Sequence, residues 1–164
     1  YDIRGKVIED FPPDVVEALG KSFGTFIKRN GGTEIALSGD VRLTTPSLIE
    51  YFKSGVLSTG VDVINIGIIP TPVNYYSMFK LDVMGAVQIT GSHNPPEFNG
   101  FKMSMSKKAV YGEANPGLTN LALQACLLQP ILTFLSVPIT YYADSSKIFV
   151  VPLVNFQGAA EHLL

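Results

Sequence analysis

Helical and strand-like segments alternate over residues 14–105, and this alternation constrains the fold more than any other feature of the chain. Apolar residues recur at helical spacing in some segments, whereas others are short apolar runs typical of buried strands. The spacing predicts helices over 14–29, over 45–60 and from 71 onward, and strands over 34–38, 61–67, 83–90 and 101–105. Such alternation predicts βαβ units and therefore an α/β fold, a three-layer arrangement in which a sheet is flanked by helices.

The helix boundaries are indicated by proline and glycine. Pro12-Pro13 precedes the first helical segment and Asn30-Gly31-Gly32 follows it. Thr45-Pro46 predicts a threonine N-cap with a first-turn proline, and Thr71-Pro72 repeats the same device.

Polar loops follow three of the predicted strands. They are Gly39-Asp40-Val41-Arg42, Pro70-Thr71-Pro72 and the run from Thr90 to Pro96. In open α/β sheets ligands bind at the carboxyl ends of the strands. We therefore expect these three loops to border one site.

The segment 90–102, TGSHNPPEFNGFK, has the chemistry of a reactive loop. Gly91 gives backbone freedom beside Ser92, and Pro95-Pro96 stiffens the second half of the loop. Asn99-Gly100 predicts a type I′ hairpin turn, which would return Lys102 to the side of the serine. A serine can carry a phosphoryl group where cations neutralise its charge.

Each of these side chains also has an ordinary interpretation. Ser92 alone is typical of a turn residue that hydrogen-bonds its own backbone. His93 alone fits a hydrogen-bonded loop residue and Lys102 a solvated lysine. Arg4 and Arg42 alone fit surface ion pairs, which contribute little to stability. Only the combination favours a functional site.

That combination resembles the signature of the α-D-phosphohexomutases, in which the loop serine is phosphorylated. Three further segments agree with the family in order and spacing: YDIRG at 1–5, GDVR at 39–42 and PTP at 70–72. The resemblance covers about residues 1–113 and is closest to the phosphomannomutase/phosphoglucomutase branch. It implies that this region is the first domain of the phosphohexomutase fold, with a phosphoserine loop at 90–96.

The resemblance also implies roles, position by position. The catalytic residues would be Ser92, Lys102, Arg4 and His93, and the phosphate-binding residues Arg42, Asn94 and Gly91. Ser92, through its phosphate, would be a ligand of Mg²⁺, with the other ligands in a missing domain. The implied reaction is intramolecular phosphoryl transfer on hexose phosphates, from hexose 1-phosphate to hexose 6-phosphate. It would pass through a bisphosphate intermediate, with a sugar bisphosphate as activator.

Residues 114–164 differ in composition from the rest of the chain. Only Asp144, Lys147 and Glu161 are charged there, and the family would place a charged amphipathic helix after Glu113. This atypical apolar tail is compatible with a membrane span, with a packed hairpin, or with a foreign or shifted reading, the interpretation we favour. Residues 147–160 faintly resemble the start of the family's second domain, so the tail could be a remnant of it.

Three loops that the family needs are absent from the sequence: an acidic metal loop, a sugar-reading segment and a C-terminal phosphate-binding loop. We therefore expect an incomplete fragment, an isomerase by family whose isolated chain is inactive. The alternative is a non-catalytic phosphosugar-binding or interaction protein that retains the loop.

Composition limits the other classes of function. The net charge of −2 and the scarcity of basic clusters argue against a nucleic-acid partner. Cys126 is the only cysteine, which excludes an internal disulfide and favours a cytoplasmic location. Gln124, Gln129 and two prolines interrupt the apolar tail and argue against a membrane partner.

Overall fold

A computed structural model of the chain describes residues 3–110, 139–144 and 147–151, and its strands form one mixed sheet. The strand order is β3-β2-β4-β5-β1-β7-β8, and β6 pairs with β5. The strands are β1 (Ile3–Lys6), β2 (Glu34–Gly39), β3 (Asp62–Ile68), β4 (Gly85–Ile89), β5 (Phe98–Met105), β6 (Lys108–Ala109), β7 (Ile139–Asp144) and β8 (Lys147–Val151). β2 is parallel to both β3 and β4, and the remaining pairings are antiparallel.

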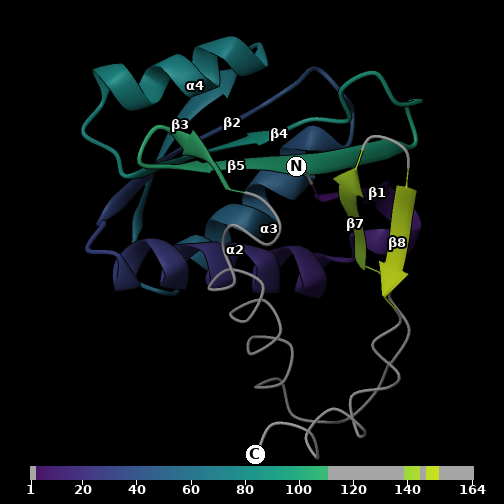
Figure 1. Cartoon of the computed structure of the whole chain (residues 1–164), viewed down its shortest axis with the longest axis horizontal. Helices are drawn as coiled ribbons and strands as arrows, with labels where there is room; N and C mark the ends of the chain where they lie inside the picture. Colours follow the sequence, from purple (N-terminus) through teal and green to yellow (C-terminus); the bar gives the residue numbers. More distant parts are fainter. Residues whose placement is uncertain (1–2, 111–138, 145–146, 152–164) are drawn as a thin grey trace, which may run out of the picture.

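Helices cover both faces of this sheet (Figure 1). α2 (Pro13–Arg29) and α3 (Thr45–Leu57) pack together on one face, and α4 (Thr71–Lys80) lies on the other. The short α1 (Val7–Asp10) follows β1. The predicted α/β fold, a sheet flanked by helices, is therefore confirmed.

The larger apolar core lies between the sheet and the α2–α3 pair. Phe101 of β5 stacks on Phe52 of α3 with ring centroids 5.4 Å apart, and Phe52 also contacts Phe23 of α2 at 6.2 Å. All three rings are fully buried. Burying a ring of this size contributes about 1.5–3 kcal/mol. This cluster therefore fixes β5, the strand that follows the serine loop, against the helices.

The Asn99-Gly100 pair does not form a turn, so that prediction is wrong. Both residues lie inside β5, where Asn99 pairs with Gly5 and Gly100 pairs with Arg4 of β1. A Cβ at Gly100 would lie 2.2 Å from the Ile3 carbonyl oxygen, so the glycine is needed for close strand packing.

Two successive residues with positive φ occur instead between β5 and β6. Ser106 (φ 49°) and Lys107 (φ 65°) form the two-residue connection, as a type I′ hairpin turn requires. Neither residue is a glycine or an asparagine, which is why the sequence did not indicate the turn.

The predicted N-caps at Thr45 and Thr71 are also wrong, and at α4 it is Pro70 that occupies the N-cap position. Thr45 is the first residue of α3, and Thr44 occupies the N-cap position without a side-chain capping bond. The Thr45 hydroxyl donates instead to the Asp40 carboxylate at 2.7 Å. A hydrogen bond to the loop just before the helix has replaced the capping bond.

Two strands of the tail extend the sheet beyond β1. β7 pairs with β1 through Tyr141 and Ile3, and β8 pairs with β7. β8 lies at the start of the segment 147–160, and the rest of that segment lies outside the described residues. The predicted boundary between 113 and 114 also lies outside them. No helix among the described residues is long and apolar enough to cross a membrane.

α2 and α3 approach each other closely through glycines. A Cβ at Gly20 would lie 2.1 Å from the Phe52 carbonyl oxygen, and one at Gly55 would lie 2.0 Å from the Glu17 carbonyl oxygen. Both obstacles are backbone atoms, which cannot move aside without separating the helices. The glycines are therefore required by the helix crossing.

We predict that Gly55→Ala destabilises the chain by about 1–2 kcal/mol. Helix propensity alone would stabilise it by about 1 kcal/mol, but overpacking against backbone costs about 1–3 kcal/mol or more. Chemical denaturation measures the net effect. The exposed neighbour Ser54→Ala is the control and should change stability little. A Gly55→Ala chain more stable than the original would contradict the close crossing.

Candidate active site

The loop from Thr90 to Glu97 connects β4 to β5 at the carboxyl end of β4. Ser92 is exposed on it and has a φ of 54°, a left-handed conformation that non-glycine residues rarely adopt. The Ser92 amide donates to the Thr90 hydroxyl at 3.0 Å, and the Ser92 hydroxyl lies 3.4 Å from His93 Nδ1. Ser92 therefore lies exposed at the end of the sheet.

Asp40 lies at the carboxyl end of β2, and its carboxylate accepts hydrogen bonds from this loop. Its Oδ1 accepts hydrogen bonds from the Thr45 hydroxyl at 2.7 Å and the Arg42 amide at 3.1 Å. Its Oδ2 accepts from the Thr90 hydroxyl at 2.8 Å, the Gly91 amide at 3.2 Å and Arg42 Nε at 3.2 Å. One carboxylate thus joins the loop after β2 (residues 40–42), the start of α3 and the serine loop.

The Arg42 guanidinium donates hydrogen bonds to backbone carbonyl groups of the same loop and of Phe98. Nη1 donates to the carbonyl oxygens of Pro95 at 2.6 Å and Phe98 at 3.0 Å. Nη2 donates to those of Asn94 at 2.7 Å and Ser92 at 3.2 Å. With Nε bound to Asp40, all five guanidinium donors have acceptors.

Gly91 makes room for this guanidinium. A Cβ at Gly91 would lie 2.3 Å from Arg42 Cζ. The φ of Gly91 is not positive, so the glycine is required by the close approach of the Arg42 side chain and not by an unusual backbone angle.

Asn99 anchors the far side of the loop. It is fully buried, and its Nδ2 donates to the hydroxyls of Thr44 and Thr45, both at 3.0 Å. Its Oδ1 accepts from the Gly100 amide at 2.9 Å. The side chain therefore links β5 to the same threonine that donates to Asp40.

Arg4 and Lys102 lie on one face of the sheet, beside the loop. Arg4 of β1 pairs with Gly100, and its Nη1 donates to the Gly91 carbonyl oxygen at 2.8 Å. Lys102 is half-buried on β5 and pairs with Gln88 of β4. Alternation along β5 puts Gly100 and Lys102 on the same face, so the register brings the two cations to the same side.

His93 and Asn94 follow Ser92 directly. His93 is exposed, and Asn94 is held by its backbone, whose amide donates to the Gly91 carbonyl oxygen at 3.0 Å. The loop therefore brings together Ser92, His93, Asn94, Gly91, Arg42 and Arg4 by direct contacts, and Lys102 by strand register.

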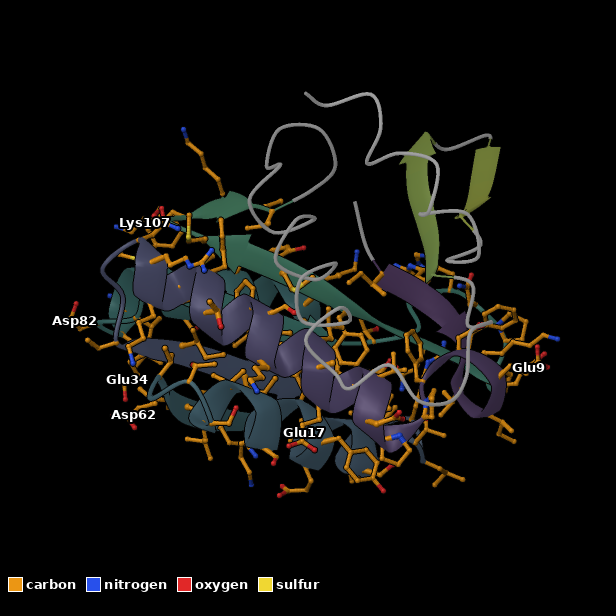
Figure 2. The ribbon with its side chains drawn as sticks, turned by 90° about the horizontal axis from the view of Figure 1, so that it is seen from below. Glu9, Glu17, Glu34, Asp62, Asp82 and Lys107 are labelled. Atoms are coloured by element: carbon orange, nitrogen blue, oxygen red, sulfur yellow. The ribbon has the colours of Figure 1, made fainter. Side chains whose placement is uncertain are left out.

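Carboxylates gather at the opposite end of the parallel strands. Glu34, Asp62 and Asp82 lie where β2, β3 and β4 begin, away from Glu9 near α1 (Figure 2). Asp40 and Glu97, by contrast, lie beside the serine loop and on it.

The described residues do not by themselves form a magnesium site. No group of three or more His, Cys, Asp or Glu side chains among them could hold a metal. Asp40, the carboxylate beside the loop, already accepts five hydrogen bonds. A phosphate on Ser92 could offer oxygen ligands, but the carboxylates that Mg²⁺ favours would have to come from elsewhere.

The fold and the loop define an α/β domain that presents a serine at the carboxyl end of its parallel strands. The family model described as "Phosphoglucomutase/phosphomannomutase, alpha/beta/alpha domain I" matches residues 1–120. The chain therefore belongs to the phosphoglucomutase/phosphomannomutase family, within the phosphohexomutases, and the predicted family is confirmed.

Individual relatives agree with this assignment. The phosphoglucomutase of Neisseria meningitidis serogroup B is 39% identical over 114 residues, 70% of this chain and 25% of that protein. The phosphomannomutase of Escherichia coli K12 is 41% identical over 103 residues, 63% of this chain and 22% of that protein. The chain thus spans about a quarter of the length of these relatives.

Solved structures show the same fold. A phosphoglucomutase/phosphomannomutase family protein from Burkholderia thailandensis superposes with a TM-score of 0.71 at 36% identity, covering 77% of this chain and 29% of that one. A structure from Thermus thermophilus, described as a putative phosphomannomutase, gives a TM-score of 0.68 at 22% identity and supports the fold alone.

Sequence reasoning missed four residues that hold the loop: Asp40, Thr45, Thr90 and Asn99. The GDVR segment contained a signal, because an aspartate two residues before an arginine in a strand-end loop can bond both its backbone and its side chain. Thr90 and Asn99 flank the serine loop, but their partners are distant in sequence and left no local pattern.

Asp40 should make the loop acid-sensitive only at low pH. Burial opposes ionisation of its carboxyl most strongly, but the donors Thr45, Arg42, Thr90 and Gly91 together outweigh burial and hold the pKa below its ordinary value of 3.8. A carboxyl with a depressed pKa contributes stability above its unfolded pKa and loses it as the pH falls through the folded pKa.

We therefore predict that Asp40→Asn is less stable than the original chain at neutral pH. The difference should persist down to about pH 4 and shrink below it, as Asp40 becomes protonated in the folded chain. Denaturant titrations over a series of pH values measure this. The exposed Asp14→Asn is the control. A stability difference that does not depend on pH would contradict the ionised network.

Proposed function

We propose that residues 1–113 are the phosphoserine-bearing domain of an enzyme that interconverts hexose 1-phosphates and hexose 6-phosphates. The observation that carries this proposal is Ser92, exposed in a left-handed conformation on a loop held by Asp40 and Arg42. Such strained positions persist where contacts over-determine them and often mark functional sites. Membership of the phosphoglucomutase/phosphomannomutase family supports the same reaction class.

In the proposed reaction a sugar hydroxyl attacks the phosphorus of phosphorylated Ser92. The bond between phosphorus and the serine Oγ breaks, the sugar becomes a bisphosphate, and Oγ takes up a proton. After the bisphosphate reorients, Oγ attacks its other phosphate, the bond between that phosphorus and the sugar oxygen breaks, and the proton leaving Oγ passes to that sugar oxygen, which releases the hexose monophosphate. Catalysis of this kind depends chiefly on positioning and charge stabilisation.

The residues around Ser92 can share these tasks. Arg4 cannot release a proton because a guanidinium remains charged, so we assign it charge stabilisation beside the Gly91 carbonyl. Lys102 can donate and accept a proton and is the stronger candidate for acid–base work. His93, whose Nδ1 lies 3.4 Å from the serine hydroxyl, would orient Oγ. Asn94 would contribute through the shape of the loop.

Mg²⁺, with carboxylate ligands from another domain, would neutralise phosphate charge when bound. A sugar bisphosphate would serve as the activator that first phosphorylates Ser92. Hexose phosphates would be the substrates, and the single cysteine favours a cytoplasmic enzyme. Because the described residues lack the metal carboxylates, we do not expect the isolated chain to turn over hexose phosphates.

Ser92→Ala should abolish turnover in a complete enzyme. The test is a chimaera in which residues 1–110 replace the matching part of the Neisseria phosphoglucomutase, assayed with glucose 1-phosphate, Mg²⁺ and glucose 1,6-bisphosphate. Intact-mass spectrometry should find one phosphoryl group, lost with Ser92→Ala. Ser106→Ala is a matched control, because Ser106 is also an exposed serine with positive φ. Near-full activity of Ser92→Ala would sink the nucleophile assignment.

Lys102→Ala should slow the same chimaera by about 10²–10⁴-fold, the usual contribution of a general acid or base. The exposed Lys108→Ala on the neighbouring β6 is the control and should keep full activity. A chimaera that binds glucose 1-phosphate but never turns over would favour the non-catalytic phosphosugar-binding alternative.

A further inference from the structure

The side chain of Arg42 has no hydrogen-bond donor left for a phosphate. Its five N–H groups point to Asp40 Oδ2, to three carbonyl oxygens of the serine loop and to that of Phe98 at the start of β5. A bidentate grip on a phosphate would need at least two of these donors. Binding phosphate would therefore require Arg42 to release the loop that carries Ser92.

The charge of Arg42 is also largely offset. Asp40 lies 3.2 Å away as an ion pair, and the two side chains are only 15% and 22% exposed. A paired arginine presents a weaker field to a nearby anion than an unpaired one. The pair is thus poorly suited to attract a phosphate.

The same contacts are well suited to shaping the loop. The carbonyls of Ser92, Asn94, Pro95 and Phe98 all converge on one guanidinium. Carbonyl oxygens engaged in this way are not free to turn toward a phosphoryl group, which they would repel. Asp40 meanwhile fixes the other side of the loop through the Thr90 hydroxyl and the Gly91 amide.

We propose that Asp40 and Arg42 are positioning residues that clamp the serine loop, and that Arg42 does not bind phosphate. Asp40 orients the guanidinium, and the guanidinium binds the loop carbonyls. The Thr90 hydroxyl donates to Asp40 and accepts from the Ser92 amide, and so connects Asp40 to the backbone of Ser92. This role replaces the phosphate contact that the sequence predicted for Arg42. Its catalytic consequence rests on the proposed function, but the clamp itself can be measured without turnover.

The test uses the ¹⁵N-labelled 164-residue chain without any ligand. Hydrogen exchange is followed at the amides of Asn94 and Phe98, which donate within the loop, and at that of Ser92. Arg42→Lys keeps the charge, but a lysine cannot span Asp40 and four carbonyls. We expect exchange at these amides to become at least about tenfold faster, equivalent to about 1.4 kcal/mol of local stability.

Two comparisons make the result specific. Asp40→Asn should accelerate the same amides, whereas Arg29→Lys, an exposed control at the end of α2, should not. Amides of β2 and β4 should keep their protection in every variant. Should Arg42→Lys fail to fold, Asp40→Asn decides the question by the same measurement.

A second readout separates a clamp from a phosphate ligand. Because Asp40 accepts from Arg42 Nε, that N–H should give a slowly exchanging resonance that does not move when inorganic phosphate is added. Loop exchange unchanged in both variants would overturn the proposal. So would a phosphate-dependent shift of the Nε resonance that Arg29 does not share.

Discussion

The geometry of the candidate site depends on the Asp40 carboxylate. A partly buried carboxylate is costly unless donors surround it, and five donors from three separate segments do so here. The low pKa of Asp40 indicates that these bonds outweigh the cost of burial. Each donor can reach the carboxylate only if β2, the start of α3 and the serine loop keep their relative positions. One charge thus joins the end of β2 and the start of α3, which are neighbours in the sequence, to the serine loop, which follows 50 residues later.

The cations of the site divide into two kinds. Arg42 is paired with Asp40, and its other donors bind backbone carbonyl groups, so it helps to fix the serine loop. Arg4 and Lys102 lie on the strands beside the loop, on one face of the sheet. In the proposed phosphoryl transfer these two, rather than Arg42, would act on the phosphoryl group.

How much the sequence could predict depends on the range of the interaction. Periodicity located α2, α3 and β2–β4 within a few residues, because it reports the buried face of each element. β1 and α1 have four residues each, too few for a period to show. The candidate site residues were proposed from a family motif, but the motif did not indicate which of them bond the backbone of the loop. That distinction depends on acceptors about fifty positions away.

Two of the wrong local predictions have the same cause. Asn99-Gly100 has the composition of a tight turn, and Thr45-Pro46 that of a helix cap. In the fold, Asn99 and Thr45 bond each other instead, and Gly100 lets β1 come close. A buried polar network uses the same side chains that would otherwise satisfy local backbone groups. At these positions the hydrogen bond between Asn99 and Thr45 and the close packing of β1 on Gly100 outweigh the local preferences for a turn and a cap.

Ser92 and Ser106 show how the same backbone angle can have different origins. Both serines have positive φ. At Ser106 a two-residue hairpin demands it, because the twist of the paired strands favours such turns. Ser92 lies in a longer loop, where no strand pairing imposes the angle. There the strain, of order 1–3 kcal/mol, must be offset by contacts on both sides of the residue: the amide with Thr90 and the carbonyl with Arg42. The backbone is therefore set before any phosphate is present, and a serine held in this way would not have to be reoriented during the reaction.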